Sequence, residues 1–440
     1  MREMKDSGEV WIGKVPKNWT IQVFKTHIES HFGGCWGEDA KNDDNDRLCI
    51  RIADFDFAKQ GIKNSASTIR NYTLNQIEKC RLQDGDLIVE KSGGGDKTPV
   101  GRVVIFDGNQ FRKDTLFANF SECVRLKKDV LSKYVAYQLK ALYYVFDMHY
   151  FFKQTTGLQN LDINTYINTH LCFPALPEQK KIAEKLDLEC SKVDALIANE
   201  EKQIEKLKEY KQSLITEVVT KGLDPDAPMK DSGVELIGLI PCNWECVSIS
   251  RIASVVRGAS PRPAGDPRFF YGDYIPWITV AEVTKGGDIY INNTDSYLTK
   301  EGAEHSRIVE EGTLLLSNSG ATLGVPKITN IRGCINDGSV AFIDITIDKK
   351  YLLYVLSAYT LELRKQRQGY GQPNLNTDIV KSIRIPVPSK KEQSLIVDYL
   401  DNKNKNIEQL ITIKQKKIDN LNQFKKSLIY EYVTGKKEVN

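Results

Sequence analysis

An internal repeat constrains the fold of this chain more than any other feature of its sequence. Residues 4–19 read MKDSGEVWIGKVPKNW and residues 229–244 read MKDSGVELIGLIPCNW, with ten identities in 16 positions. A second pair of segments, 182–220 and 396–434, aligns without gaps and ends in KLKEYKQSLITEVVT and NLNQFKKSLIYEYVT. Such self-similarity is typical of a chain built from repeated structural units.

The regions between these segments match more loosely. Short motifs recur in the same order: Lys133–Tyr137 with Lys350–Tyr354, Gln159–Leu161 with Pro373–Leu375, and Asp84–Leu87 with Glu311–Leu314, each of the last pair being followed by Ser-Gly. We therefore expect each half to contain a shared frame around a divergent middle.

The long repeated segment predicts a helix with a coiled-coil seam, because seam positions recur at alternating steps of four and three. Its apolar members are Val193, Ile197, Ile204, Leu207, Leu214 and Val218 in the first copy and Ile407, Ile411, Ile418, Leu421 and Leu428 in the second. Polar residues share the seam at Glu200, Lys211, Lys414 and Lys425. The alternative is an ordinary amphipathic helix on a globular core, which the repeat makes less favoured.

The helix ends can also be predicted. The first helix is expected to begin near Pro177 and to stop at Gly222, a C′ glycine, and the second to run from a capping box at Ser389 and Glu392 to Gly435. About 43 residues at a rise of roughly 1.5 Å make a rod on the order of 65 Å long. Because the first rod leaves the first globular unit and the second must run back, we expect an antiparallel pair.

Short apolar runs between Gly, Pro, Asn and Asp predict strands at Leu87–Val89, Val103–Ile105 and Leu314–Leu316, and a helix is expected near 131–153 and again near 349–367. The predicted fold class is α+β, with two mixed globular domains joined by two long helices in an antiparallel coiled coil with a pseudo-two-fold internal repeat. The predicted division is 1–177 and 223–389 for the domains, and 178–222 and 390–440 for the helices.

Composition excludes several classes of protein. With 41% hydrophobic residues the chain is neither disordered nor collagen-like, and a net charge of +3 means that any nucleic-acid surface must be local. The charged first ten residues and the lack of a long uncharged apolar run predict a cytoplasmic chain without a membrane span. Nine scattered cysteines suit reduced thiols, and Cys242 and Cys246 lack nearby partners for a zinc site.

The residues that several enzyme classes require are missing. Residues 93–98 place Asp96 where a phosphate loop needs glycine, and the chain has no Pro-Pro pair of an amino-methylating loop and no nuclease motif. The histidines at 27, 31, 149, 170 and 305 form no paired motif. An enzyme is therefore the least favoured hypothesis, and a binding surface remains.

Glycines that admit a phosphate backbone, together with Arg, Lys, Asn, Gln, Ser and Thr, suit contacts to phosphates and base edges. In the first half such residues are interleaved with Trp36 and Phe55, and in the second with Trp277. The candidate DNA-binding residues are Arg51, Lys91, Ser92, Gly93, Gly94, Lys97, Arg102, Gln159 and Asn160 in the first half, and Arg257, Arg262, Thr279, Ser317, Ser319, Thr322, Gln372 and Asn374 in the second.

The two MKDSG boxes, the helices ending in SLI.E.VT and the variable regions between them resemble the DNA-specificity subunit of type I restriction-modification enzymes over essentially the whole chain. GGCWGE (33–38), RIADF (51–55), IVEKSGGG (88–95) and PVGRV (99–103) are similar to one type of that family's target-recognition domain, and YIPWITVAEV (274–283) and LLLSNSGATLG (314–324) to another. The resemblance assigns no base-contacting residue, so the candidates above rest on residue type.

The resemblance implies a noncatalytic subunit. Each target-recognition domain would read one half of a bipartite site in double-stranded DNA, and the helices would dock two modification (methyltransferase) subunits and then restriction (translocase and nuclease) subunits. This chain would bind no cofactor or metal itself, since S-adenosylmethionine belongs to the modification subunit and ATP with Mg to the restriction subunit. Two alternatives remain open: a stand-alone sequence-specific DNA-binding regulator, and a noncatalytic coiled-coil scaffold that joins two protein-binding domains.

Overall fold

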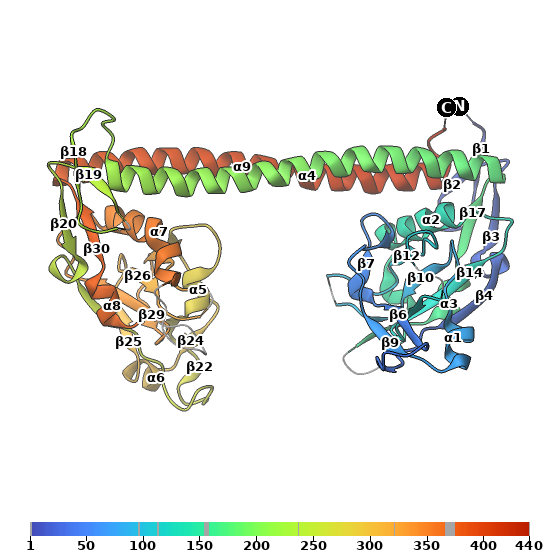
Figure 1. Ribbon diagram of the computed structural model, residues 1–440, viewed down its shortest axis with the longest axis horizontal. Helices are drawn as coiled ribbons and strands as arrows, with labels where there is room; N and C mark the ends of the chain where they lie inside the picture. The colour runs from blue at the N-terminus through green and yellow to red at the C-terminus, as the bar shows by residue number, and fades with distance from the viewer. Residues whose placement is uncertain are drawn as a thin grey trace. The chain divides into compact units, whose positions relative to one another are not determined.

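The computed structural model describes residues 2–95, 97–111, 114–153, 158–235, 237–320, 322–365 and 375–439. The chain forms two compact units, one of residues 1–200 with 416–440 and one of residues 201–415. Each unit combines small sheets with helices and contains part of both long helices, as the α+β prediction requires (Figure 1). The division into four segments stays a prediction, because the two compact units divide each long helix near its middle.

The first unit has a central antiparallel sheet in the order β12-β10-β14-β4. Its strands are β12 (Val103–Ile105), β10 (Leu87–Glu90), β14 (Ser121–Leu126) and β4 (Ile28–Gly33). A second sheet has the order β13-β6-β9-β5, in which β13 and β6 are parallel. Its strands are β13 (Leu116–Phe117), β6 (Asp46–Ile50), β9 (Ile69–Asn71) and β5 (Glu38–Asp39).

Smaller pairings complete the first unit. They are β11 (Ser92–Gly93), β16 (Gln159–Leu161) and β15 (Phe152–Lys153); β1 (Met4–Asp6) with β2 (Lys14–Pro16); β3 (Thr20–Val23) with β17 (His170–Phe173); and β7 (Phe55–Asp56) with β8 (Gly61–Ile62). Its shorter helices are α1 (Leu74–Cys80), α2 (Ser132–Val145) and α3 (Ile163–Ile167), with 3-10 turns at Phe24–His27, Ile52–Asp54 and Met148–Phe151.

The second unit repeats this frame. Its central sheet has the order β21-β29-β26-β27-β23, and its second sheet has the order β24-β22-β28-β25 with β22 and β28 parallel. These strands are β21 (Ser254–Arg257), β29 (Ser339–Ile343), β26 (Leu314–Ser317), β27 (Pro326–Thr329), β23 (Tyr290–Ile291), β24 (Tyr297–Leu298), β22 (Phe270–Ile278), β28 (Gly333–Ile335) and β25 (Arg307–Val309).

The remaining elements of the second unit are β18 (Met229–Asp231) with β19 (Leu239–Pro241), β20 (Glu245–Ser248) with β30 (Arg384–Val387), a 3-10 turn at Ile249–Arg251, and the helices α5 (Val280–Thr284), α6 (Lys300–Glu304), α7 (Lys349–Lys365) and α8 (Thr377–Ser382). The three predicted strand segments lie in strands, and the helix predicted near 349–367 corresponds to α7. The helix predicted near 131–153 is too long: α2 ends at Val145, and a 3-10 turn and β15 follow it.

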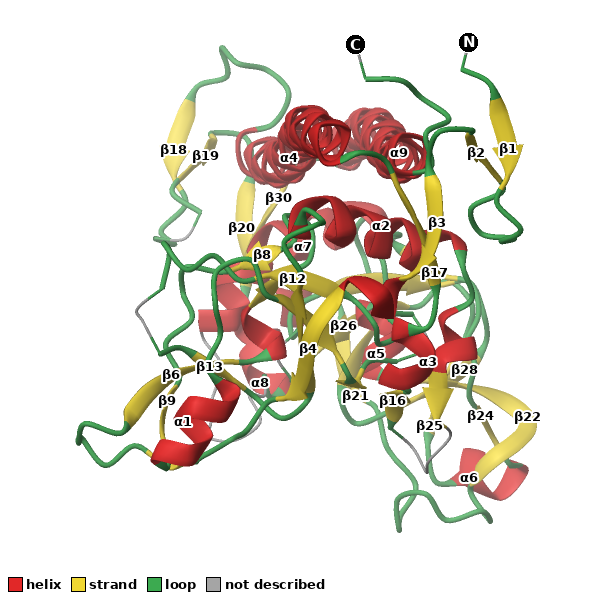
Figure 2. Cartoon of the chain, turned by 90° about the vertical axis from the view of Figure 1, so that its right-hand side faces the viewer, coloured by secondary structure: helices red, strands yellow, loops and turns green. Residues whose placement is uncertain are grey.

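The long helices are α4 (Leu176–Lys221) and α9 (Lys390–Val433), which lie side by side (Figure 2). α4 ends at Lys221, and the φ of 79° at the next residue, Gly222, confirms the predicted C′ glycine. At the start of α9 the Glu392 backbone donates to Ser389 Oγ at 3.3 Å, but the Glu392 carboxylate accepts from Trp244 Nε1 at 3.0 Å. The predicted capping box is therefore only half formed, because the Glu392 carboxylate accepts a hydrogen bond from Trp244 of the second MKDSG segment instead.

The two long helices contact each other along the predicted seam. All eleven apolar residues predicted for it are buried or half-buried. The polar seam positions have partners on the opposite helix: in the first unit Lys425 Nζ lies 2.6 Å from Asp194 Oδ1, and Lys417 Nζ 2.6 Å from Glu200 Oε1. In the second unit Lys211 Nζ lies 2.6 Å from Glu408 Oε1. Partner numbers fall on α9 as they rise on α4, so the pairing is antiparallel.

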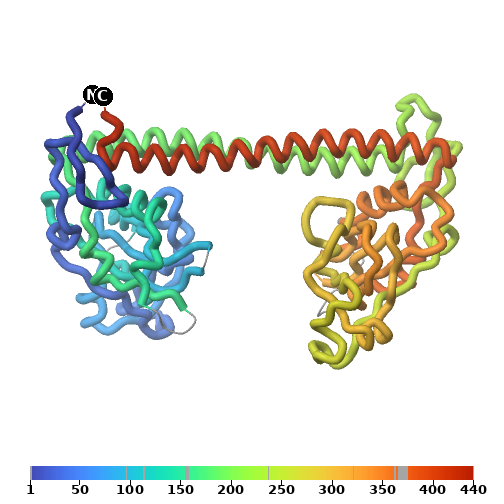
Figure 3. Tube along the Cα trace, turned by 180° about the vertical axis from the view of Figure 1, so that it is seen from behind, coloured from blue at the N-terminus to red at the C-terminus, as the bar shows by residue number. Residues whose placement is uncertain are grey.

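The long helices also enter the core of each unit. In the first unit, Ile182 and Leu186 of α4 and Ile429 and Val433 of α9 are buried in one cluster with Trp19. In the second, the corresponding cluster combines the end of α4 and the start of α9 with Trp244. The chain termini lie close together in the first unit (Figure 3), where Tyr430 Oη donates to Ile12 O at 3.1 Å.

The recurring KYxxY motif lies on α2 and α7 and joins these two helices to the long helices. Tyr134 Oη donates to Val433 O at 3.2 Å, and Tyr351 Oη to Val219 O at 3.3 Å. Both hydroxyls are buried, and burial raises the pKa of each tyrosine, so both stay protonated donors. The second tyrosine of the motif, Tyr137, donates to Asp187 Oδ1 of α4 at 2.7 Å.

Removing one member of the Asp194–Lys425 pair gives a test of the seam. Asp194→Ala leaves the Lys425 ammonium, whose side chain is 8% exposed, without its counter-charge, whereas Lys425→Met removes the charge and keeps the packing volume. Asp194 is itself partly exposed, so we expect Asp194→Ala to cost about 1–3 kcal/mol more than Lys425→Met. Urea unfolding followed by circular dichroism measures this difference.

Glu209→Ala, which removes an exposed carboxylate from the same helix, is the control and should leave the unfolding midpoint unchanged. Equal losses for Asp194→Ala and Lys425→Met would contradict the assignment of a buried ammonium to this seam.

Candidate nucleic-acid interface

The first unit brings together two predicted segments that are far apart in the sequence. The loop after β10 pairs with β16, so that Ser92 is opposite Asn160 and Gly93 is opposite Gln159. Ser92 Oγ donates to Asn160 Oδ1 at 2.5 Å. Gly94 has a φ of 65°, and a Cβ there would lie 2.9 Å from Gln159 Oε1, so this position requires glycine. The predicted residues Lys91–Gly94 and Gln159–Asn160 therefore form one surface.

Lys91 supplies a positive charge to this surface, but a buried carboxylate moderates it. Its Nζ lies 3.0 Å from Glu122 Oε2, and His31 Nδ1 lies 3.0 Å from the other oxygen of Glu122. The Glu122 side chain is 5% exposed and that of Lys91 is 37% exposed. Lys91 is thus held in place and still accessible to a ligand.

The other predicted cations of the first unit are Lys97, Arg51 and Arg102, and they differ in the ion pairs that they form within the unit. Lys97 is exposed at the turn between the bridged residues Gly95 and Thr98. The Arg51 guanidinium lies 3.2 Å from Asp54 Oδ2, and the hydrogen bond and charge of Asp54 raise the pKa of Arg51. The arginine is half-exposed and available to a ligand.

The Arg102 guanidinium is already bound to Glu90 within the unit. Its Nε and Nη2 each donate to a Glu90 oxygen at 2.7 Å, and its guanidinium lies 3.8 Å from the centre of the Phe57 ring. Burial alone would lower the pKa of Arg102, but the hydrogen bond and charge of Glu90 outweigh it and raise the pKa. A DNA contact by Arg102 would have to break this ion pair.

In the second unit two predicted arginines converge on one turn. Arg257 Nε donates to Asp337 O at 2.9 Å, and Arg262 Nη2 lies 3.1 Å from Asp337 Oδ2. Ser260 Oγ donates to the other carboxylate oxygen at 2.6 Å. Both arginines are exposed, so this turn presents two anchored cations to solvent.

The other predicted residues of the second unit have different environments. Ser317 is buried, donates to Thr322 O and accepts from Val325 N, each at 2.9 Å, so it closes a loop and cannot contact a ligand in this conformation. Ser319 is half-buried and Thr322 exposed on that loop. Gln372 and Asn374 lie outside the described residues.

Matching backbone hydrogen bonds show which residues of the two candidate surfaces are equivalent. Leu161 N donates to Lys91 O at 2.8 Å, and Leu375 N donates to Asn318 O at 2.8 Å. Gly101 N donates to Glu90 O at 2.9 Å, and Gly324 N to Ser317 O at 2.7 Å. The two surfaces are therefore equivalent places in one repeated frame.

A further equivalence links two predicted residues. Arg51 directly follows β6 and Thr279 directly follows β22, the strands that form the parallel pair in each unit. Each residue is the N-cap of the short helical turn that comes next. Arg51 and Thr279 are both candidates by residue type, and the fold shows that they occupy the same position in the two units.

Sequence reasoning missed the acidic partners Glu90, Glu122 and Asp337, which position the predicted cations. For Glu90 a signal was available, because a charged residue ends the apolar run Leu87–Val89. It also missed Tyr271 and Tyr297, which line a pocket beside Thr279.

Among the described residues, no group of three or more His, Cys, Asp or Glu side chains could hold a metal ion, and the nine cysteines are free thiols. No helix in the described part of the chain is long and apolar enough to cross a membrane.

A family model described as the type I restriction modification DNA specificity domain matches residues 50–209 and 241–423. The putative type I restriction enzyme MjaX specificity subunit of Methanocaldococcus jannaschii is 25% identical over 432 residues, which cover 97% of this chain and 95% of that protein. The MjaVIII specificity subunit of the same organism is 27% identical over 297 residues, and the alignment covers 64% of this chain and 65% of the relative.

Two solved structures share the fold. A chain of a type I R-M system, from work on its complex assembly and conformational transition, superposes with a TM-score of 0.69 at 16% identity, covering 95% of this chain and 98% of that chain. The HsdS subunit from Thermoanaerobacter tengcongensis superposes with a TM-score of 0.50 at 16% identity, covering 96% of this chain and 98% of that chain.

The different environments of Lys97 and Arg102 predict different phenotypes. Lys97→Ala should leave stability unchanged, weaken binding to a random-sequence duplex and reduce the slope of log K against log salt by about 0.9, because one phosphate contact is lost. Arg102→Ala should destabilise the unit by about 3 kcal/mol, because Glu90, whose side chain is 2% exposed, loses its counter-charge. Salt-titrated binding and urea unfolding measure the two effects.

Lys25→Ala removes an exposed lysine outside this surface and serves as the control for both assays. An unchanged salt slope for Lys97→Ala would remove Lys97 from the candidate interface, and an unchanged unfolding midpoint for Arg102→Ala would contradict its structural role.

Proposed function

The chain belongs to the family of type I restriction-modification DNA specificity domains, and from this premise we propose that it reads a bipartite, asymmetric DNA site for a complex that carries the catalysis elsewhere. Its relatives are specificity subunits, the noncatalytic DNA-recognition components of restriction-modification complexes. The match covers both halves of the chain, which is why one half-site is assigned to each unit.

The observation that carries the proposal is the presence of different side chains at equivalent positions of one frame. Arg51 in the first unit corresponds to Thr279 in the second. Lys91, which is 37% exposed, corresponds to Asn318, which is buried and donates to Leu375 O, so an uncharged side chain stands at that place in the second unit. An arginine or lysine donates to guanine or phosphate, whereas a threonine hydroxyl suits other base edges. Two units with the same frame and different reading residues should recognise two different half-sites.

The partners follow from the same proposal. They are double-stranded DNA, two modification subunits and the restriction subunits. S-adenosylmethionine would be bound by the modification subunits, and ATP with Mg by the restriction subunits. The sequence supports this division, because it contains neither a phosphate loop nor the Pro-Pro pair of an amino-methylating loop.

A genome-wide map of N6-methyladenine tests the function directly. Single-molecule sequencing of the source strain, with the gene intact and with it deleted, should show one bipartite, asymmetric motif that loses methylation on deletion. Complementation with the intact gene is the control and should restore the same motif.

Two results would contradict the proposal. Identical maps, in a strain where the modification subunit is expressed and assembles with this chain, would favour the scaffold hypothesis. A motif made of two identical half-sites would refute the assignment of different specificities to the two units.

The helix pair gives a second test. Inserting one heptad between Glu200 and Glu201 and another between Gln415 and Lys416 keeps the seam period in both helices. Because half-site separation is geometric, we expect the methylated motif to change its spacer and to keep both half-sites. The methylation map of the insertion strain is the measurement. A changed half-site would show that the helices take part in base recognition, contrary to the proposal.

A further inference from the structure

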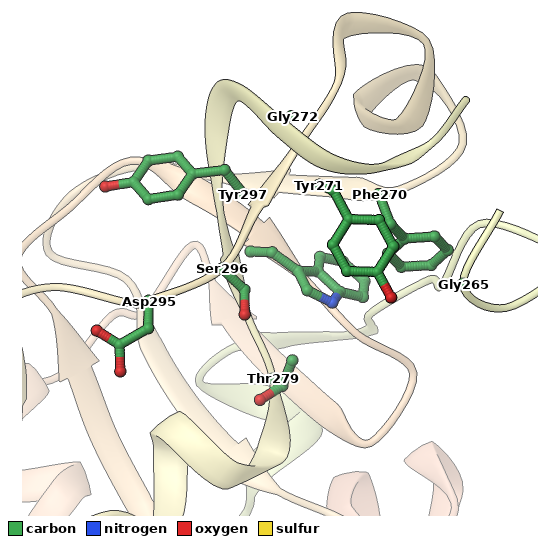
Figure 4. A pocket seen from close by; sticks show the side chains of 9 residues that line it. Gly265, Phe270, Tyr271, Gly272, Thr279, Asp295, Ser296 and Tyr297 are labelled. Carbon is green, nitrogen blue, oxygen red and sulfur yellow. The ribbon is translucent and has the colours of Figure 1, made fainter. Parts of the chain in front are cut away.

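The second unit contains a pocket of about 550 Å³ beside Thr279. Three of its aromatic side chains come from β22: Phe270, Tyr271 and Trp277. Figure 4 shows the rings of Phe270 and Tyr271 on one side, Thr279 and Ser296 near the middle, and Asp295 and Tyr297 on the other side. The pocket therefore combines ring faces with hydroxyl and carboxylate groups.

The backbone conformation that exposes Tyr271 to solvent is strained. Tyr271 has a φ of 62°, in the left-handed region that a bulky residue rarely adopts. The pairing of β22 with β24 is interrupted between Phe270 and Ile275, so the strand bulges at this point. The result is a tyrosine side chain that is 84% exposed. Strained backbone of this kind is concentrated at binding sites.

The inner wall of the pocket is rigid. Trp277 is buried, and its ring packs edge-on against Phe270 with 6.1 Å between centroids and 73° between planes. The Trp277 backbone is held on both sides, since its N donates to Ser296 O at 2.8 Å and its O accepts from Thr294 Oγ1 at 3.0 Å. This wall of the pocket is thus held in place by contacts within the unit.

The charge of the lining selects the chemistry of the ligand. No lysine or arginine is among the described residues that line the pocket, and its one ionisable acid is Asp295. The Asp295 carboxylate lies 3.4 Å from Lys285 Nζ and is 86% exposed. A phosphate would meet no cation in this lining, whereas a neutral planar heterocycle could stack on the rings and donate to the hydroxyl and carboxylate oxygens.

We infer that this pocket takes up one unstacked nucleobase of the half-site read by the second unit, with Tyr271 as its stacking face. The inference rests on the proposed function and adds a specificity-determining residue to it. Thr279, which occupies the position of Arg51 in the other unit, places the pocket next to the candidate reading surface. Stacking accepts any base, so selectivity would come from the exocyclic groups that meet Ser296 and Asp295.

The experiment uses the complex of this chain with its modification subunits and the duplex motif obtained from the methylation map. Each nucleotide of the second half-site is replaced in turn by an abasic nucleotide, on either strand, and affinity is measured for the wild type, Tyr271→Phe and Tyr271→Ala. Removing the base opposite an extruded base abolishes the cost of unpairing, whereas removing the extruded base abolishes its stacking.

At one base pair of the second half-site, we expect removal of the extruded base to weaken wild-type binding about tenfold. Removal of the base opposite it should tighten binding. Tyr271→Ala should abolish both responses, and Tyr271→Phe should keep them because the ring remains. A methyltransferase extrudes its own target base, so the methylated adenine should respond in all three proteins alike and is the internal control. Tyr150→Ala, which removes an exposed ring from the first unit, is the matched control variant.

Responses in Tyr271→Ala that equal the wild-type responses at every position would overturn this inference and leave the proposed function intact. Weakened binding after removal of either base of each pair would show that the bases are read while paired, which also overturns it. A complex that binds no DNA selectively would overturn the proposed function and this inference with it.

Discussion

In each unit a glycine follows the end of a long helix. The proline and the tryptophan of the repeated MKDSG segment pack against this glycine. A Cβ on Gly435 would lie 2.4 Å from Pro16 and 3.1 Å from the Trp19 ring, and a Cβ on Gly222 would lie 3.2 Å from the Trp244 ring. At Gly435 only a residue without a side chain allows this approach, at Gly222 a Cβ would crowd the ring, and both glycines have positive φ as well. In the first unit this contact joins the start of the chain to its end. It explains why the proline and tryptophan of the two boxes are identical, because both copies must meet the same helix terminus.

The same logic explains most of what could be predicted from the sequence. A contact that both copies need leaves the same residues in both, as with the KYxxY tyrosines that donate to the ends of the long helices. The seam was predictable because its period is set by helix geometry, and its polar positions because each has a partner on the other helix. Helix ends and core strands were likewise accessible from local residue patterns.

What could not be predicted depends on non-local pairing. The parallel pairing of β6 with β13, and of β22 with β28, brings together segments whose spacing carries no local signal. The equivalence of Arg51 and Thr279 follows from that pairing and not from residue type. For the same reason the sequence indicated cations but not their counter-charges: Arg102 looks like a DNA-binding residue until Glu90 is placed beside it.

The interior of the frame shows how one scaffold can support two reading surfaces. At equivalent strand ends the first unit buries the Glu90–Arg102 ion pair, and the second buries Ser317, whose hydroxyl accepts from the backbone of Val325. Each solution satisfies the buried polar group: Glu90 accepts from Arg102, and Ser317 donates to Thr322 O and accepts from Val325 N in the loop after β26. Because Ser317 bonds only to backbone atoms of that loop, the side chains of the loop can change while these hydrogen bonds stay. A repeat that is strict at the helix ends and divergent at the loops is the sequence pattern expected of such a design.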